Sequence, residues 1–439
     1  MRFLWSLIAV LIFGTGTLFA QKVLLGETVK TGECFQYELG LTLSGKMKID
    51  REGKQQELTV RGQANHTFTD RIETTNTSGA AGKAYRHYTV AKSAHTVGGD
   101  GSKRELNKEH RLIGVVRSDR ATVHFSPTGP LTREELELVA QHFDTLALTG
   151  LLPGTELAVD GTWAVSSEAI QQACLFDGLI KHDVKGMLTS IKDGVATWTL
   201  AGTAEGLDTG ATARVTIKAT GTFDVATTRI TSLEWEQSDD RDLGPASPAM
   251  EVQAKISLKR TALSKEPAEL NADVRGKLPG DKIPEALLKL QLDDAGNEFV
   301  LNYSRDWSVI GKASTHTVLR LLQAGDFVGQ ATITNWSRAG KGEHSKATDF
   351  IAAINKTPGW EPLEVISDGE QKAAPGTWVY RYSVKGKRDG ATVVQTFNFI
   401  AGPGGQQLLV TYLSSPEKVA ELAKREQEFI DGLTFRTAK

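Results

Sequence analysis

The sequence is poor in the residues and spacings that mark enzymes and metal sites. Its 439 residues include two cysteines, Cys34 and Cys174, so zinc sites built from cysteine pairs are excluded. None of the nine histidines stands in an H-x-x-x-H or H-E-x-x-H pattern, and no nucleophile elbow, phosphate loop or dinucleotide fingerprint is present. We therefore expect no metal, no cofactor and no catalytic residue.

The charge balance also excludes a class of partners. The formal net charge is -2, with acidic and basic residues mixed along the chain. Nucleic acids and anionic membrane surfaces are bound through clustered lysine and arginine, because binding depends on the release of counterions. We expect no nucleic acid as partner.

Long hydrophobic runs are absent after the first twenty residues. Arg2 gives the start a positive charge, Phe3–Phe13 is apolar apart from Ser6, and small residues lead to Ala20. This layout predicts a signal peptide over residues 1–20 and an exported protein, in the periplasm or outside the cell. The alternative is a retained N-terminal anchor, although the apolar stretch is short for a spanning helix. We expect no transmembrane segment in the mature chain.

In an oxidising compartment, the two cysteines of this chain could be joined by a disulfide. Cys34 and Cys174 form either a disulfide or two unrelated buried thiols, which behave as small apolar residues. The sequence does not decide between these readings.

Residues 21–263 read as a β-rich antiparallel domain shaped like a half-barrel. Phe35, Tyr37 and Leu39 alternate with polar residues, and similar period-2 segments continue to Leu258, separated by short turns. Two helices interrupt this meander. One runs from a capping box of Thr132 and Glu135 toward Gly150, and the other begins near Ser166 or Ser167.

A cluster of aspartates stands where we expect a turn between two of these strands. Asp239, Asp240 and Asp242 read as a solvated loop, with a calcium ion as the alternative because hard cations prefer carboxylate oxygens.

Residues 264–289 are rich in breakers, including Pro267, Gly280 and Pro284, and we expect a linker there. Residues 290–439 then alternate between strands and two helices, the second opening on Ser415 and Pro416. This order predicts an antiparallel sheet flanked by helices, an α+β sandwich. The fold class is therefore mainly β, or α+β.

The C-terminal domain resembles the PsbP-like superfamily. The resemblance rests on Phe299–Tyr303 followed by an aromatic-polar step to Trp307, on Gly325-Asp326-Phe327, and on a closing helix that ends in Phe429–Phe435. It implies an α+β sandwich that binds partner proteins or assists assembly and is generally not an enzyme.

The N-terminal domain resembles, in architecture alone, the exported half-barrels related to the lipoprotein carrier LolA. That resemblance implies an apolar concavity suited to acyl chains.

These inferences predict an exported, non-enzymatic protein of a bacterial envelope with two binding modules. Its partner is expected to be a protein, or an apolar or lipid ligand. The alternatives are an enzyme whose site assembles only in the fold, and a structural subunit of an envelope complex.

Overall fold

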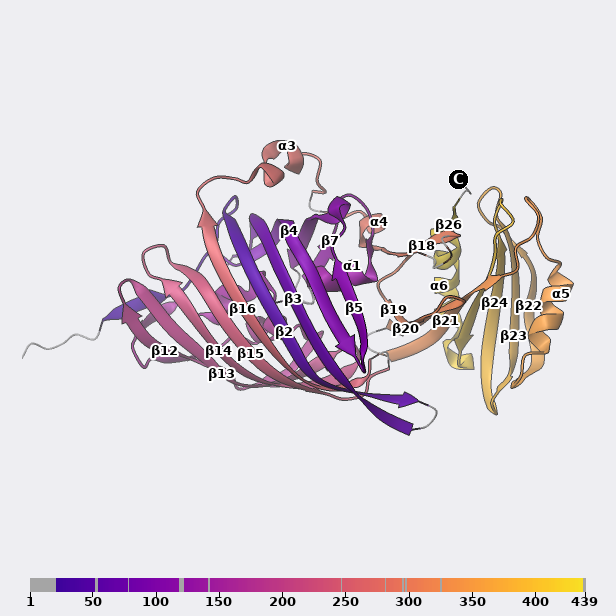
Figure 1. Cartoon of the computed structure of the whole chain (residues 1–439), viewed down its shortest axis with the longest axis horizontal. Helices are drawn as coiled ribbons and strands as arrows, with labels where there is room; N and C mark the ends of the chain where they lie inside the picture. Colours follow the sequence, from indigo (N-terminus) through magenta and orange to yellow (C-terminus); the bar gives the residue numbers. More distant parts are fainter. Residues whose placement is uncertain are drawn as a thin grey trace, which may run out of the picture.

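The computed structural model shows a large N-terminal lobe beside a smaller C-terminal one (Figure 1). It describes residues 21–51, 54–77, 79–117, 122–140, 143–245, 247–280, 282–293, 296, 298–323 and 326–436. The predicted signal peptide, residues 1–20, lies outside the described residues.

One curved antiparallel sheet of thirteen strands forms the N-terminal lobe. Its side chains alternate between a buried inner face and a polar outer face, as the period-2 pattern predicts. The strands are β2 (Cys34–Arg51), β3 (Lys54–Thr75), β4 (Ala81–Val97), β5 (Asp100–Glu105), β6 (Leu112–Arg117), β7 (Thr122–Phe125), β10 (Thr162–Ala164), β11 (Gly178–His182), β12 (Lys185–Lys192), β13 (Val195–Asp208), β14 (Ala211–Asp224), β15 (Arg229–Arg241) and β16 (Ala249–Leu263). A separate two-stranded ladder joins β1 (Lys22–Leu25) to β9 (Thr155–Ala158).

The sheet is made of two meanders joined in the middle. The order β10-β12-β13-β14-β15-β16-β2-β3-β4-β6-β7 places the last strand, β16, against the first, β2. The chain between β7 and β11 must therefore pass from one edge of the sheet to the other.

Helices carry the chain across this span and cover the inner face. They are α1 (Arg133–Ala140), the 3₁₀ helix η2 (Thr145–Leu151) and α2 (Ser167–Ala173), and their apolar residues join those of the sheet in one core. Phe143, just before η2, packs edge-on against Trp235 with ring centroids 5.5 Å apart. The curved sheet thus wraps around the helices.

The two predicted helix starts are confirmed. Thr132 Oγ1 accepts a hydrogen bond from the Glu135 amide at 3.1 Å, and the Glu135 carboxylate accepts one from the Thr132 amide at 3.0 Å. Ser166 caps α2 by accepting from the Ala169 amide at 3.2 Å. The first helix is shorter than expected, because Asp144 opens η2 by accepting from the Leu146 amide at 3.0 Å.

Residues 264–289, expected as a linker, carry the 3₁₀ helix η3 (Ala268–Leu270), α3 (Ala272–Arg275) and α4 (Glu285–Leu288). The segment lies against β4, where Lys83 and Tyr85 donate hydrogen bonds to the Pro279 carbonyl at 3.1 and 2.8 Å. Leu270 is fully buried with Tyr85 and Phe125.

A small sheet links the two lobes. Its order is β26 (Leu433–Phe435), β18 (Phe299–Tyr303), β17 (Leu290–Asp293) and β8 (Leu131–Thr132), and β8 runs directly into α1. The β17–β8 ladder is parallel, and the others are antiparallel. Arg133 adds a hydrogen bond to the Trp307 carbonyl at 2.7 Å.

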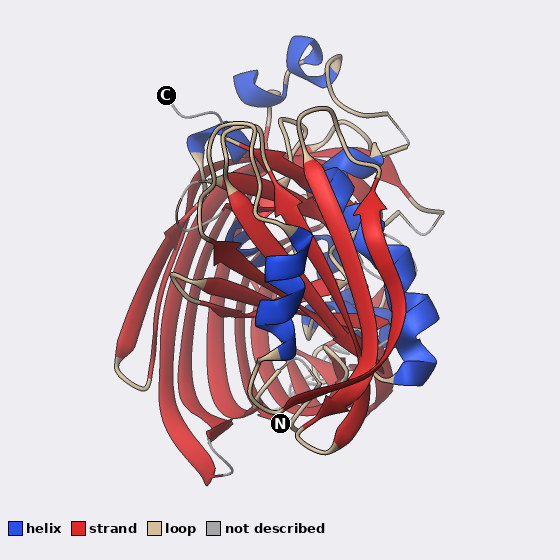
Figure 2. Ribbon diagram, turned by 90° about the vertical axis from the view of Figure 1, so that its right-hand side faces the viewer, coloured by secondary structure: helices blue, strands red, loops and turns tan. Residues whose placement is uncertain are grey.

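A seven-stranded antiparallel sheet with a helix on each face forms the rest of the C-terminal lobe. Its order is β19 (Trp307–Lys312), β20 (His316–Gln323), β21 (Asp326–Trp336), β25 (Gln407–Ser414), β24 (Ala391–Ala401), β23 (Trp378–Arg388) and β22 (Trp360–Gln371). Phe429 of α6 (Val419–Gly432) packs on Trp307, and Phe350 of α5 (Ala347–Asn355) stacks on Phe399 on the opposite face. The 3₁₀ helix η4 (Pro416–Lys418) leads into α6. Figure 2 shows these helices against the strands.

The predicted fold class, mainly β with an α+β C-terminal domain, is confirmed. One long strand was missed. β22 carries Pro362, Asp368 and Gly369, which mark a turn in sequence, yet two bulges let it pair along its length with β23.

Gly221 provides a test of how the sheet is packed. It lies opposite Trp198, and a Cβ there would overlap the buried indole ring. We expect Gly221→Ala to lower the free energy of unfolding by about 1–3 kcal/mol, the usual cost of overpacking a core. Urea denaturation measures this.

Gly62→Ala is the matched control, because a Cβ on this strand glycine meets its nearest neighbour at 3.6 Å. Its stability should be unchanged or higher by up to about 1 kcal/mol. Equal losses in the two variants would contradict the packing argument.

Candidate functional site: a cavity inside the half-barrel

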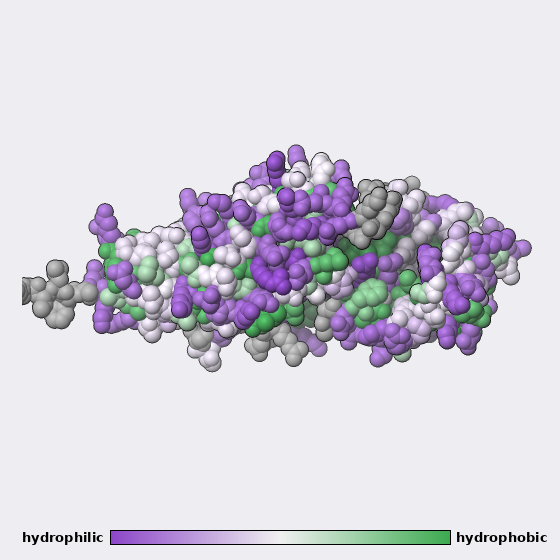
Figure 3. Space-filling view, turned by 90° about the horizontal axis from the view of Figure 1, so that it is seen from below, coloured by the Kyte–Doolittle hydropathy of each residue, from purple (hydrophilic) through white to green (hydrophobic). Residues whose placement is uncertain are grey.

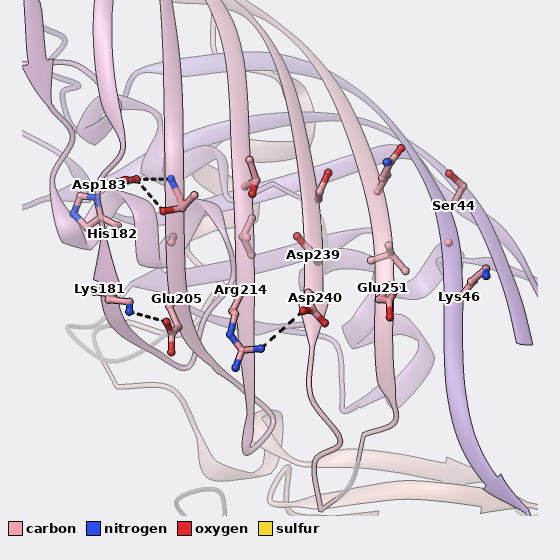
Figure 4. Close-up of a pocket in the computed structure, with 18 of the residues that line it drawn as sticks. Ser44, Lys46, Lys181, His182, Asp183, Glu205, Arg214, Asp239, Asp240 and Glu251 are labelled. Carbon is pink, nitrogen blue, oxygen red and sulfur yellow. Dashed lines mark hydrogen bonds and ion pairs between the residues drawn. The ribbon is translucent and has the colours of Figure 1, made fainter. Parts of the chain in front are cut away.

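The outer face of the N-terminal sheet carries a row of charges that neutralise one another. Residues directly opposite across six neighbouring strands form the row, and Figure 4 shows it crossing a shallow groove of about 1050 Å³. Lys181 pairs with Glu205 at 3.1 Å, and Arg214 with Asp242 at 3.2 Å. Exposed pairs of this kind contribute about 0–1 kcal/mol each, so the row is a solvated surface. Its members are Lys181, Glu205, Arg214, Asp240, Glu251 and Lys46.

Asp239 and Asp240 belong to this sheet and not to a turn, which corrects the sequence interpretation, whereas Asp242 follows the end of β15. Asp239 and Asp240 are consecutive residues of β15, so their side chains point to opposite faces. They cannot share a calcium ion. No group of three or more potential metal ligands occurs among the residues that the structure describes.

The inner face holds two adjoining hollows of about 1170 and 330 Å³, which together we call the inner cavity. Its floor is the sheet, and its cover is α1, α2 and the residues that follow α2. The smaller hollow is mainly apolar, with Leu41, Leu138, Phe143 and Ile256 in its lining. The two hollows share Leu43, Cys174, Leu175, Gln237, Asp239 and Met250.

A hydrogen-bonded ladder on β15 leads from the core to the mouth of the cavity. Trp235, Gln237, Asp239 and Arg241 are two residues apart and therefore share the inner face. The Trp235 indole donates to Gln237 at 2.8 Å, and the Gln237 amide donates to both Asp239 oxygens at 3.0 Å. Burial raises the pKa of Asp239 to about 6. The lining thus changes from apolar to charged along one strand.

Sequence reasoning missed this ladder. The alternation of Leu233 and Trp235 continues through Gln237 and Asp239, but the adjacent aspartates suggested a turn. The period-2 pattern was the signal that would have identified it.

The mouth is more acidic than basic. Arg241 is held by Asp208 at 2.5 Å, and Asp177 accepts from the Thr209 amide at 2.7 Å. Lys181, whose amine pairs with Glu205 on the outer face, is the other cation at the rim of the lining, which also includes Glu168 and Asp144. Five carboxylates and two lysine or arginine side chains line the larger hollow, so a positively charged group is favoured there.

A buried ion pair fixes the helical cover to the sheet. Arg86 and Asp70 are both fully buried, and the guanidinium Nε lies 3.0 Å from Asp70 Oδ1. Arg86 Nη2 also donates to the Thr145 hydroxyl of η2 at 2.7 Å. Thr122 in turn donates to Asp144 at 3.0 Å. The start of η2 is thereby attached to β4 and β7.

Two buried histidines are uncharged and serve the packing of the N-terminal lobe. His66 lies on the inner face with Asp70, but its Nε2 lies 2.9 Å from the Leu138 carbonyl of α1. Burial lowers the pKa of His66 to about 4. Burial and the charges of Arg86 and Arg305 hold the pKa of His124 well below its usual range.

Of the two alternatives for the cysteines, the structure has two free thiols, Cys34 and Cys174. Cys34 starts β2, whereas Cys174 caps α2 and lines the cavity beside Leu43. Leu43 is nine residues along β2 from Cys34, roughly 30 Å of strand, far beyond disulfide reach. Burial raises the pKa of the Cys174 thiol.

A histidine and a carboxylate meet outside the cavity. His110, in the 3₁₀ helix η1 (Lys108–His110), lies 2.9 Å from Glu135. The same carboxylate completes the α1 capping box and accepts from the Asn107 amide. Neither residue lines a described pocket, so the pair serves the start of α1.

Seen from below, hydrophobic residues form small separate groups among hydrophilic ones (Figure 3). In the part of the chain that the structure describes, no helix has the length and apolar character to cross a membrane.

The Arg86–Asp70 pair gives a stability prediction. Arg86→Met leaves an unpaired buried carboxylate, and we expect it to cost about 3–5 kcal/mol of unfolding free energy. The double variant Asp70→Leu/Arg86→Met removes both charges and should recover part of this loss in urea denaturation. A double variant no more stable than the single one would contradict the role of the buried charge.

The His110–Glu135 pair gives a pH prediction. The hydrogen bond to Glu135 raises the pKa of His110. Burial raises the pKa of Glu135, but its hydrogen bonds with His110 and Thr132 outweigh this and leave it lowered. The stabilisation by His110 is thus fully present below its unfolded pKa of about 6.5 and is lost as pH rises through the folded value.

His110→Gln should accordingly lower stability more at about pH 5.5 than at about pH 8.5. Thermal unfolding at both pH values measures this difference. A loss that is equal at the two values, or larger at the higher one, would refute the charged pair.

Comparison with known proteins gives weak likenesses of fold. No protein-family description and no curated protein sequence matches the chain. The cyanobacterial PsbP of Synechocystis sp. PCC 6803 is 12% identical, with 36% of this chain and 96% of that chain covered and a TM-score of 0.28. A DUF1329 family protein from Desulfovibrio piger is 11% identical, covering 56% and 92%, with a TM-score of 0.13.

Lipovitellin is 8% identical to this chain, covering 55% of it and 27% of the lipovitellin chain, with a TM-score of 0.29. These are weak structural resemblances only, to a PsbP protein among others.

Proposed function

We propose that the protein is a non-enzymatic binding protein whose inner cavity holds one single-chain amphiphile. The acyl chain lies in the apolar hollow between the sheet and α1, and the polar head lies at the acidic mouth. A zwitterionic or cationic head group suits the lining of the larger hollow.

The observation that carries this proposal is that the side chains on the inner face of β15 change from apolar to polar and charged along the strand. Trp235 is fully buried, Gln237 and Asp239 follow in the cavity, and Arg241 reaches the mouth. Ligand cavities commonly measure about 300–1,000 Å³ and combine apolar walls with a few placed polar groups. An amphiphile matches both ends of such a lining.

We also propose that the protein acts outside the cytoplasm. The leader at residues 1–20 supports a site in the periplasm or outside the cell.

The test is a fluorescent lysophosphatidylcholine probe together with mass spectrometry of organic extracts from the purified protein. We expect saturable binding by the wild-type chain and a co-purifying lipid. Ala64 lines the apolar hollow beside Leu41, so Ala64→Phe fills it and should weaken probe binding by about tenfold or more.

Asn65→Phe is the matched control, because Asn65 is exposed on the opposite face of the same strand. It should bind like the wild type. An empty extract combined with no probe binding would overturn the proposal, as would equal weakening in the two variants.

A further inference from the structure

Strand β22 is an open edge of the C-terminal sheet. It lies at one end of the strand order, and among the described residues it pairs with β23 alone. It is twelve residues long and lies at the far side of the C-terminal lobe, next to α5 (Figure 1). A long edge with unpaired amides and carbonyls is a template for one more strand.

The edge is also apolar where it is most exposed. Leu363, Val365 and Ile366 have exposed fractions of 53%, 54% and 50%. Bulges between Pro362 and Glu364 and between Val365 and Ser367 interrupt the alternation of this strand. Natural edges are protected by lysine and other charged side chains, by proline, by bulges or by a covering element, and β22 carries Pro362 and two bulges but no lysine.

The charges on this strand are all of one sign. β22 contains Glu361, Glu364, Asp368 and Glu370 and no lysine or arginine. Asp368 accepts a hydrogen bond from the Tyr380 hydroxyl. Glu361, Glu364 and Glu370 make no ion pair with any residue that the structure describes. Glu361 and Glu364 lie opposite Lys387 and Lys385 of β23, so their charges are partly balanced across that ladder. The strand itself carries acidic side chains alone and therefore favours a basic segment.

These charges argue against a second copy of the chain as the occupant. An antiparallel pair of β22 strands would place side by side two strands that each carry four acidic side chains and no lysine or arginine. Like charges directly opposite across a ladder are destabilising.

We propose that β22 binds an extended segment of a partner protein, rich in lysine or arginine and in β-branched residues, as an eighth strand. Backbone hydrogen bonds along the edge supply the attachment, and Leu363, Val365 and Ile366 supply apolar contact. The acidic residues select a basic segment and reject an acidic one. This proposal is independent of the inner cavity, which lies in the other lobe.

The test uses the full chain and a fluorescently labelled synthetic peptide of alternating lysine and valine, followed by fluorescence anisotropy. We expect saturable binding that weakens as salt is raised, and none for the matched peptide of glutamate and valine. Val365→Lys places a lysine on the edge and should weaken binding by about tenfold or more. Backbone amides of β22 should become protected from hydrogen exchange when the peptide binds.

Leu243→Lys is the control variant, because Leu243 is an exposed apolar residue (71%) of the N-terminal lobe. It should bind the peptide like the wild type. Equal weakening in the two lysine variants would overturn the proposal, as would equal binding of the two peptides. Self-association in sedimentation that Val365→Lys abolishes would also overturn it, since it would assign the edge to a second copy.

Discussion

The fold depends on covering the inner face of a sheet that never closes. A barrel would satisfy its strands by closing on itself, whereas this sheet leaves two edges and a concave apolar surface. The inner face is covered by the segment of chain that crosses from one edge of the sheet to the other. Arg86 is the central attachment, because one guanidinium holds both Asp70 of the sheet and Thr145 of the cover. The cavity exists where the cover is incomplete.

Much of the architecture could be predicted from the sequence, because short-range patterns determine the helix starts and most strands and tertiary contacts do not change them. The capping box at Thr132 and the cap at Ser166 depend on nearby residues alone, so sequence identified them. The strands of both sheets followed from alternation. β22 was missed because Pro362 and Gly369 are turn residues in most contexts, and only the pairing with β23 makes them part of a strand.

The residues that line the cavity could not be predicted from the sequence, because they come from elements that are far apart along the chain. Its lining combines Ala64 of β3, Phe143 near η2, Cys174 at α2 and Asp239 of β15, which only the strand order brings together. No spacing in the sequence records such a set. Whether Cys34 and Cys174 pair was open in the sequence for the same reason, because only the order of the strands shows that they lie in separate parts of the lobe.

The parallel ladder between β8 and β17 bears on how the chain is assembled. β8 leads into α1, its partner β17 lies far along the sequence, and the small sheet is completed by β26 close to the last described residue. Contacts between such distant segments form late, since the closing loop must be ordered first. The β8–β17 ladder thus ties the start of α1 to the C-terminal lobe, so the helical cover of the N-terminal sheet is held in part by a strand of the other lobe.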